Sequence, residues 1–330
     1  MTTIDMKSVG GKHVVFGPGD EHYDFGWRGP ASRVGAITGT NLVLHEARLA
    51  AMPRFLISGA WQLEGPRYAL WKAAKQVLGR HLSYNHQLTG SCVGAGGGNM
   101  LKTQICVEIS QGDPEEYREV WWPYTYGRSR THSGMDSEGE GSSGSGWAEA
   151  ITRDGSLAQD ETASLPPFRV VDGWLQLTEG IEFQWSRGAY GEQQVGTVAK
   201  KHLVKTASPM RSAEDCIAAL ANGYCITQAS NFGFRSSKVR GTPPVRIAPW
   251  DGSWSHQTYV TEYWDHPTEG EIFYWGNNWG PKSHGEPTGD EPPGGVYIEK
   301  ETMEAICRDG ETYAFSAYNG FPARKLTWLI

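Results

Sequence analysis

The sequence lacks long hydrophobic runs and clusters of positive charge. No stretch of its 330 residues approaches the roughly 20 consecutive apolar residues that a membrane-spanning helix requires. Lysine and arginine are scattered along the chain, and the formal net charge at pH 7 is -7. A basic surface for nucleic acid or anionic lipid is therefore not expected, and the sequence predicts neither a nucleic-acid partner nor a membrane partner.

The N-terminal sequence also lacks a secretory signal. MTTIDMKSVGGKHVVF has no basic flank, no apolar centre and no small-residue cleavage site. We therefore expect a cytoplasmic protein, an expectation that is compatible with virion association or with release by lysis.

Cysteines are few, and their pattern argues against two common roles. The five cysteines are odd in number, widely spaced and never arranged as CxxC, which argues against a disulfide framework and a structural zinc site. The polar loop at 132–146 resembles a calcium loop at Asp136, Glu138 and Glu140, but Trp147 stands where such a loop carries glutamate. No metal or organic cofactor is expected.

The composition of the chain changes along its length and indicates three zones. Residues 1–79 are punctuated by glycine and proline and are expected to form an N-terminal arm with one or two short helices, the better one from Pro66 to Leu78. Residues 80–165 are expected to form a helical lobe. Residues 166–330 are expected to form a β-rich lobe with a C-terminal extension, because runs such as GIEFQWS, GYCITQAS, HQTYVTEYW and GEIFYWG are typical of strands. Helices first and strands later indicate an α+β fold.

Two helices can be placed more closely. The stretch HQLTGSCVGAGGGNM, residues 86–100, is expected to continue as a helix because apolar residues recur four apart from Leu101 onward. Its glycines at 94 and 96–98 each weaken a helix by up to ~1 kcal/mol relative to alanine, so we expect close backbone packing there. A further helix, capped by Ser212, is expected to interrupt the strands.

Cys92 lies at the predicted first turn of the helix that follows GSC. An intracellular cysteine most often fills space in the core, and this interpretation suits the other four. At a helix N-terminus, however, the unpaired N–H groups and the helix dipole favour a thiolate. Such a nucleophile needs a base, which His256 in the predicted strand WSHQTYV supplies, and a group that orients the base, which the run WGNNWG at 275–280 supplies.

Gln87, the GSC that ends at Cys92, His256 and the NNWG run that starts at Asn277 follow one another in this order. In order and character they resemble the papain-like cysteine peptidases, and the chain looks like a divergent member of bacterial or phage type. The resemblance implies a two-lobed α+β fold. In it a helical lobe is followed by a β-barrel-like antiparallel lobe, and the active-site cleft lies between them.

The same resemblance implies a role for each residue of these motifs. Cys92 is implied to be the nucleophile, His256 the base, Asn277 the residue that orients the base, and Gln87 part of the oxyanion hole. The run GSSGSGW resembles the glycine loop of the non-primed subsites. The residues implied to bind substrate are Gly144, Ser145, Gly146 and Trp279. The expected function is a thiol-dependent endopeptidase whose partner is a protein or peptide substrate.

The chain also departs from the family pattern around the nucleophile. Gln87 lies five residues before Cys92, whereas the family usually has six, and His86 occupies the sixth position. Thr89 stands where secreted members carry a cysteine that forms a disulfide.

The two adjacent asparagines are distinguished by strand geometry. Side chains alternate along a strand, so Asn277 and Trp279 are expected to share one face while Asn278 faces away and completes the turn. Asn278 replaces the serine that the family usually has.

Two other classes of function are compatible with these motifs. One is a catalytically silent papain-fold module that serves as a structural or binding part, for example of a particle. The other is a cell-wall amidase or transamidase that uses the same three residues, which would suit the 14 tryptophans only if they contact carbohydrate. The N-terminal arm lacks long charged helices and is expected to dock on an assembly partner.

Overall fold

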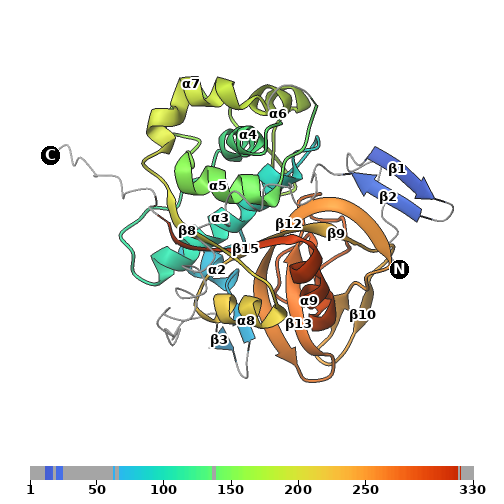
Figure 1. The fold of residues 1–330 in the computed structure, drawn as a ribbon. Coiled ribbons are helices and arrows are strands. Elements are labelled where there is room, and N and C mark those ends of the chain that lie inside the picture. Colours follow the sequence, from blue (N-terminus) through green and yellow to red (C-terminus); the bar gives the residue numbers. More distant parts are fainter. Residues whose placement is uncertain are drawn as a thin grey trace.

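The computed structural model places the helices mainly on one side of the molecule and most of the strands on the other (Figure 1). It describes residues 12–17, 20–24, 62–63, 67–135, 139–318 and 320. The helices are α2 (Lys72–Leu78), α3 (Cys92–Ser110), α4 (Trp122–His132), α5 (Gly144–Arg153), α6 (Glu179–Trp185), α7 (Gly188–Ala199), α8 (Ala213–Ala221) and α9 (Lys300–Asp309). None of these helices is both long and apolar enough to span a membrane.

The strands are spread over most of the described chain. They are β1 (Lys12–Gly17), β2 (Asp20–Asp24), β3 (Gln62–Leu63), β4 (Arg67–Ala69), β5 (Asn85–His86), β6 (Arg169–Val171), β7 (Trp174–Gln176), β8 (Val204–Pro209), β9 (Ile226–Gly233), β10 (Lys238–Arg240), β11 (Val245–Ile247), β12 (Gly252–His266), β13 (Gly270–Gly276), β14 (Gly295–Glu299) and β15 (Glu311–Tyr318). The strands β9, β12 and β13 fall on runs that were predicted from their β-branched and aromatic content. The expected α+β class is confirmed.

The larger sheet runs in the order β10-β11-β14-β13-β12-β9-β15-β8. Most neighbours are antiparallel, although β11 and β14 pair in parallel. Because β10 and β8 end this order, the described strands form an open sheet and do not close into the expected barrel-like lobe. A second, smaller sheet has the strand order β5-β7-β6.

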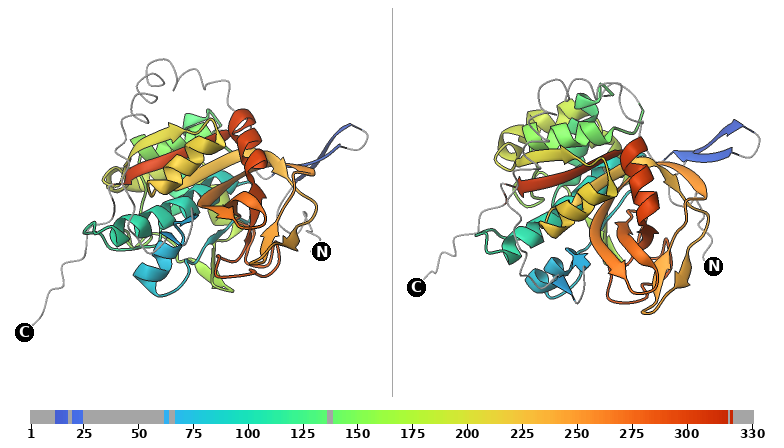
Figure 2. Two further views of the ribbon diagram at one scale, coloured as in Figure 1. Left: turned by 90° about the horizontal axis from the view of Figure 1, so that it is seen from below. Right: turned by 60° about the horizontal axis from the view of Figure 1, so that its bottom comes forward.

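The long strand β12 is the centre of the larger sheet. Its first half, from Gly252 to Thr258, pairs with β9, and its second half, from Tyr259 to His266, pairs with β13. It additionally pairs with β2 and β4, which come from the N-terminal part of the chain. The β1–β2 hairpin projects from the body in Figure 1 and in both views of Figure 2. β2 runs parallel to Ser253, Trp254 and Ser255, the residues of β12 that precede His256.

Residues 67–79, which the sequence analysis assigned to the arm, join the core. β4 pairs with β12, and α2 begins at Lys72 and ends at Gly79, whose φ of +71° suits a glycine. The buried carboxylate of Glu262 in β12 accepts a hydrogen bond from Trp71 Nε1 at 2.6 Å and binds Arg67. The second short helix allowed for the arm, at the run EARLAAM (residues 46–52), lies outside the described residues.

The glycines of α3 are explained by close packing, as the sequence predicted. A Cβ atom on Gly97 would lie 2.1 Å from Cε2 of Trp147, and one on Gly96 would lie 2.9 Å from the backbone oxygen of Gln257. Larger side chains would push α3 away from α5 and β12. The helix propensity lost at these glycines is therefore offset by the packing that they allow.

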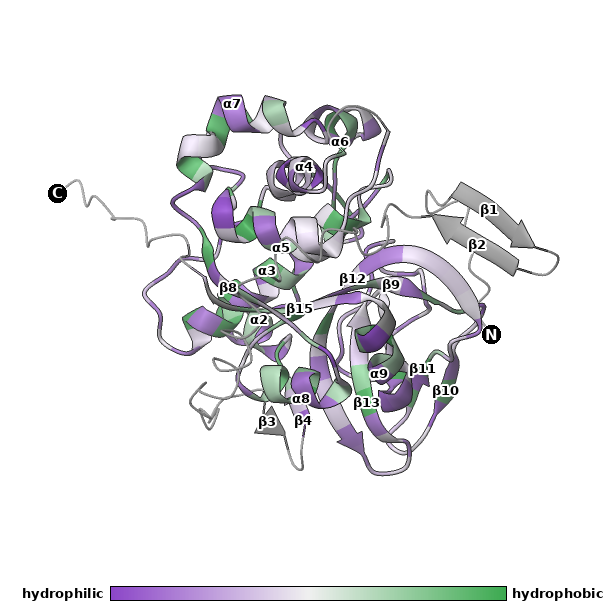
Figure 3. Ribbon diagram, in the orientation of Figure 1, coloured by the Kyte–Doolittle hydropathy of each residue, from purple (hydrophilic) through white to green (hydrophobic). Residues whose placement is uncertain are grey.

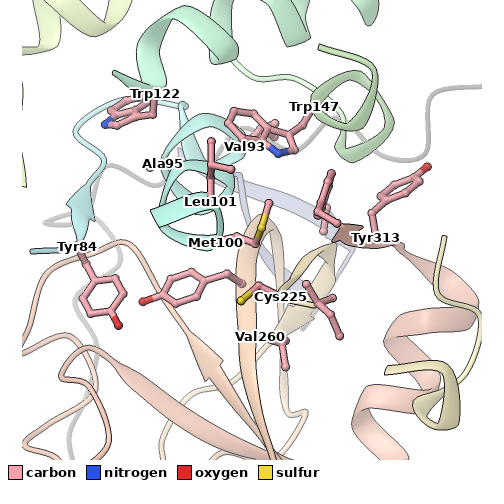
Figure 4. Close-up of a cluster of buried hydrophobic side chains, with 14 of the residues drawn as sticks. Tyr84, Val93, Ala95, Met100, Leu101, Trp122, Trp147, Cys225, Val260 and Tyr313 are labelled. Carbon is pink, nitrogen blue, oxygen red and sulfur yellow. The ribbon is translucent and has the colours of Figure 1, made fainter. Parts of the chain in front are cut away.

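Figure 4 shows how α3 lies inside the main hydrophobic cluster. Trp122 and Trp147 pack on the side of the helices, while Val260 of β12 lies on the side of the sheet. All three are buried. Burying a side chain of this size stabilises the fold by about 1.5–3 kcal/mol, so α3 is held on both sides.

Polar helices also contribute to the core. Figure 3 colours α4 largely purple, yet most of its residues are buried. Arg130 donates to the Gly141 oxygen at 2.8 Å, and Tyr126 donates to the Gly90 oxygen at 3.0 Å. Each of these hydrogen bonds gives a buried donor an acceptor.

One predicted strand is wrong. The run GIEFQWS was expected to be a strand, but its residues form α6, which Thr178 caps by accepting a hydrogen bond from the Ile181 N–H at 3.2 Å. Glu182 and Trp185, three apart on the helix, are both buried. Helices α6 and α7 lie beside α4 (Figure 1), and the division of the lobes at residue 165 remains a prediction.

The helix expected after Ser212 is confirmed as α8. The Ser212 side chain accepts a hydrogen bond from the Asp215 N–H at 3.1 Å, as an N-cap residue does. Helices α6, α7 and α9, which also lie in the zone expected to be rich in strands, were not predicted.

Candidate active site

Cys92 is the first residue of α3 and is buried. The backbone N–H of Gln257 in β12 donates to its Sγ at 3.4 Å. The Gln257 side chain donates to the Val93 oxygen at 3.1 Å. The N-terminus of α3 is thus tied to β12 at the residue directly after His256, and this contact brings the candidate nucleophile and base together.

His256 contacts two residues of the segment that follows β13, Asn277 and Trp279. Its Nε2 lies 2.7 Å from Oδ1 of Asn277, the residue that follows β13. The indole of Trp279 stacks on the imidazole with ring centroids 4.8 Å apart and an interplanar angle of 28°. Burial lowers the pKa of His256 to about 3, although the hydrogen bond to Asn277 acts in the opposite direction. The imidazole is therefore neutral at neutral pH.

The orientation of the Asn277 amide follows from its backbone neighbour. The N–H of Asn278 can only donate, and it lies 2.7 Å from Asn277 Oδ1. Oδ1 is therefore the acceptor on this side, and His256 Nε2 carries the proton of their hydrogen bond. Nδ1 of His256 is then the ring nitrogen that can accept a proton.

Asn278 contacts the segment before Cys92, and it does more than complete a turn. Its Nδ2 donates to Gln87 Oε1 at 2.8 Å and approaches the Cys92 oxygen at 3.4 Å. The Gln87 backbone N–H donates to the Asn278 oxygen at 3.0 Å. The expectation that Asn278 plays no further part is wrong, because its amide connects the segment before Cys92 to the segment after β13.

Gln87 and His86, the two candidates for the oxyanion-hole residue before Cys92, lie in different surroundings. Gln87 is buried, and its Nε2 donates to the Thr89 oxygen at 2.9 Å. His86 instead contacts Gln176, whose Nε2 donates to His86 Nδ1 at 2.6 Å. Burial lowers the pKa of His86 to about 4. Gln87, and not His86, therefore contacts the backbone around Cys92.

The segment at 87–91, here called the nucleophile loop, is anchored by a buried carboxylate from α6. Glu182 accepts hydrogen bonds from the backbone N–H groups of Leu88 and Thr89, each at 3.2 Å. It also accepts from the hydroxyls of Thr89 at 2.8 Å and Ser91 at 2.6 Å. Burial raises the pKa of Glu182 to about 7, while these hydrogen bonds lower it.

A second carboxylate reaches the same loop. Glu140 accepts a hydrogen bond from the Gly90 N–H at 2.9 Å. The Gly90 oxygen accepts the hydrogen bond from Tyr126. The N–H and the oxygen of Gly90 are thus both bonded to side chains from the helical side of the molecule.

Neither a protein-family model nor a curated protein sequence matches the chain. Solved structures do match it. Xylellain, a cysteine protease from Xylella fastidiosa, aligns with a TM-score of 0.52 and 13% sequence identity over 79% of this chain and 87% of its own. The chain has the papain-like fold. At this identity the likeness extends to the fold alone.

Two further structures with the papain-like fold also match. Digestive procathepsin L 3 from Tenebrio molitor larvae aligns with a TM-score of 0.49 and 11% identity over 83% of this chain and 79% of its own. The proform of the ragweed pollen cysteine protease Amb a 11 aligns with a TM-score of 0.45 and 13% identity over 81% of this chain and 67% of its own.

Within the papain-like fold, the expected substrate-binding residues Gly144, Ser145 and Gly146 form the first turn of α5 and are buried. Their backbone N–H groups are engaged inside the protein. Glu311 of β15 accepts from Gly144 at 2.8 Å and from Ser145 at 3.1 Å, and Ser143 accepts from Gly146 at 3.0 Å. Their role in binding substrate remains a prediction.

Sequence reasoning missed the residues that support the site from distant elements. Glu182 was placed in a predicted strand, and it lies some 90 positions after the loop that it binds. Glu311 reaches α5 across 167 positions. No local sequence pattern indicates such contacts. The structure also places His284 against Asn277.

Proposed function

We propose that the chain is a cysteine peptidase that hydrolyses peptide bonds with Cys92 as nucleophile, His256 as base and Asn277 as the residue that orients the base. The observation that carries the proposal is the buried hydrogen bond from His256 to Asn277, which Trp279 covers. His256 lies on β12, the strand whose next residue, Gln257, contacts the Cys92 sulfur. The papain-like fold supports the same reaction class.

In the proposed reaction, Nδ1 of neutral His256 takes the proton of the Cys92 thiol. The sulfur forms a bond to the peptide carbonyl carbon, and the π electrons of the carbonyl move to its oxygen. The imidazolium then gives its Nδ1 proton to the amine as the C–N bond breaks, which leaves a thioester. Water, deprotonated by His256, attacks the thioester, and the sulfur leaves and regains the proton.

Two N–H groups are proposed to stabilise the negatively charged oxygen of the intermediate. They are the backbone N–H of Cys92, at the N-terminus of α3, and Nε2 of Gln87. Asn278 holds Gln87 through Oε1, which leaves the Nε2 end of the amide as the donor. One of the two Nε2 protons donates to Thr89, and the proposal assigns the other to the substrate oxygen.

The test is covalent labelling of the intact chain by a peptide epoxide, with the labelled residue mapped by mass spectrometry. We expect rapid labelling of Cys92, hydrolysis of a fluorogenic peptide, and loss of both in Cys92→Ser. The four other cysteines are also buried, and they serve as internal controls. Equal labelling of several cysteines would overturn the assignment.

Assays with peptidoglycan fragments and with an added amine separate the alternatives. A silent structural module would hydrolyse no peptide, and a cell-wall amidase would cleave peptidoglycan fragments but leave unmodified peptides intact. An acyl-enzyme that is released by an added amine rather than by water would indicate a transamidase.

A further inference from the structure

A second buried histidine lies on the far side of Asn277. Nδ2 of Asn277 and Nε2 of His284 are 2.8 Å apart. His284 belongs to the connection between β13 and β14, and its side chain is buried. The structure thus contains a continuous line of hydrogen-bonded groups from His256 through Asn277 to His284.

The direction of these hydrogen bonds is determined. The Asn278 N–H fixes Oδ1 of Asn277 on the side of His256, so the amide NH₂ group must face His284. An NH₂ group can only donate. Nε2 of His284 is therefore the acceptor, and the proton of a neutral His284 is on Nδ1.

The surroundings of His284 favour this neutral form. The rings of Phe234, Trp279 and Trp275 lie around it, with centroids 5.0, 5.8 and 6.0 Å from the imidazole. Burial lowers the pKa of His284 to about 3, and the facing groups His256 and Arg246 lower it in the same direction. An uncharged imidazole keeps Nε2 available as an acceptor.

The other nitrogen of this imidazole, Nδ1, differs from Nε2 in its hydrogen bonding. Nδ1 of His284 makes no hydrogen bond with any residue in the described part of the chain. A buried donor without a partner costs about 1–3 kcal/mol. A histidine that served packing alone would give way to an apolar ring in this aromatic pocket, so the observed contact with Asn277 is the interaction that the side chain provides.

An acceptor at this position controls which way the Asn277 amide faces. Without it, the NH₂ group of Asn277 would be buried without a partner, and a turn of the amide by 180° would be opposed only by the hydrogen bonds of Oδ1 with His256 and Asn278. The turned amide would present its NH₂ group to two donors, His256 Nε2–H and the Asn278 N–H. Both hydrogen bonds would be lost, and His256 could adopt the other tautomer.

We infer that His284 is a positioning residue, which accepts the hydrogen bond of Asn277 and thereby holds His256 in the tautomer whose Nδ1 can accept a proton. This inference rests on the proposed function for its effect on catalysis. Its effect on the tautomer of His256 does not depend on activity.

The test compares His284→Phe with His284→Gln. Phenylalanine fills the pocket but has no acceptor, whereas the Oε1 atom of glutamine can take the place of Nε2. We expect His284→Phe to lower kcat by at least about tenfold, the effect of losing one buried hydrogen bond, with KM nearly unchanged. His284→Gln should recover most of this loss.

A double variant separates positioning from general destabilisation. Asn277→Ala combined with His284→Phe should be no slower than Asn277→Ala alone, because both changes remove the same constraint. Rate losses that multiply, or a glutamine variant as slow as the phenylalanine variant, would overturn the inference.

A spectroscopic measurement tests the inference without activity. The Nε2–H proton of His256 should give a protected downfield NMR signal in the native protein and in His284→Gln, and this signal should be lost in His284→Phe. If the native protein shows the signal but hydrolyses no peptide, the proposed function fails while the positioning role stands. A signal that persists in His284→Phe would refute the positioning role itself.

Discussion

Replacing Glu182 by glutamine should change how the stability of the protein depends on pH. The carboxylate is buried and accepts four hydrogen bonds from the nucleophile loop at 87–91. Burial raises its pKa from an ordinary value of 4.5 to about 7. The folded protein therefore binds a proton more tightly at this site than the unfolded chain does.

The sign and size of the effect follow from this difference. The stabilisation by the protonated carboxyl is fully present below pH 4.5 and is lost as the pH rises through about 7. The shift corresponds to about 3 kcal/mol in the free energy of unfolding. Glutamine does not titrate, so Glu182→Gln should lack this decline.

The assay is urea unfolding at a series of pH values between about 4 and 8. Glu108→Gln is the matched control, because burial also raises the pKa of Glu108 to about 7. Glu108 accepts its hydrogen bonds from Gln104 and Tyr318, away from the nucleophile loop. Both variants should flatten the pH dependence to a similar extent.

Hydrogen exchange then distinguishes the two sites. The amides of Leu88 and Thr89 should exchange faster in Glu182→Gln than in the native protein, because the variant has one acceptor oxygen where the carboxylate has two. In Glu108→Gln these amides should exchange at the native rate. If the free energy of unfolding of Glu182→Gln stays parallel to that of the native protein across this pH range, or if these amides exchange at the native rate, the reasoning is refuted.

Four further predictions concern the site and its surroundings. Asn277→Ala should lower kcat by at least about tenfold, on the order of 1.4 kcal/mol in the transition state; a native rate would remove Asn277 from the mechanism. Asn278→Ser, which removes the amide that binds Gln87, should lower kcat by about threefold to tenfold with KM unchanged, the effect of one weakened buried hydrogen bond, and steady-state kinetics on one peptide checks both variants. Because burial depresses the pKa of His256, the imidazole stays neutral and able to accept a proton until the pH falls well below its ordinary value of 6.5; the acid limb of kcat/KM should therefore lie below pH 6.5, and a midpoint at or above that value would contradict this environment. Because β2 pairs with the residues that precede His256, removal of residues 1–24 should raise the rate of Cys92 alkylation, whereas a rate unchanged by truncation would show that the arm does not control access.

Local features of the sequence predicted the elements that carry the motifs. The helix from Cys92, its tolerance of glycine, the Ser212 cap and the strands around His256 depend on periodicity, capping and residue size, which act over a few neighbouring positions. The order of the motifs likewise indicated the papain-like fold. These features are encoded in short segments, so they can be recognised without knowledge of the tertiary structure.

The sequence did not predict α6, because a seven-residue run of mixed aromatic and β-branched residues is compatible with both a strand and a helix. The tertiary structure decided in favour of the helix, where Glu182 meets the nucleophile loop and Trp185 enters the core. Arg67 and Trp71 joined the core for a similar reason, since their partner Glu262 lies about 190 positions away.

The sequence by itself thus determined which residue types are available for chemistry and the helix and strands that present them. Only the tertiary structure decided how those residues are held: Asn278 on Gln87, His284 on Asn277, and the carboxylate of Glu182 on the nucleophile loop. Each of these is a hydrogen bond between buried groups, and its partner is chosen by the packing of elements that are mostly far apart in sequence. Such partners cannot be read from local patterns, because the same side chain would satisfy its hydrogen bonds with water or with another group in a different fold.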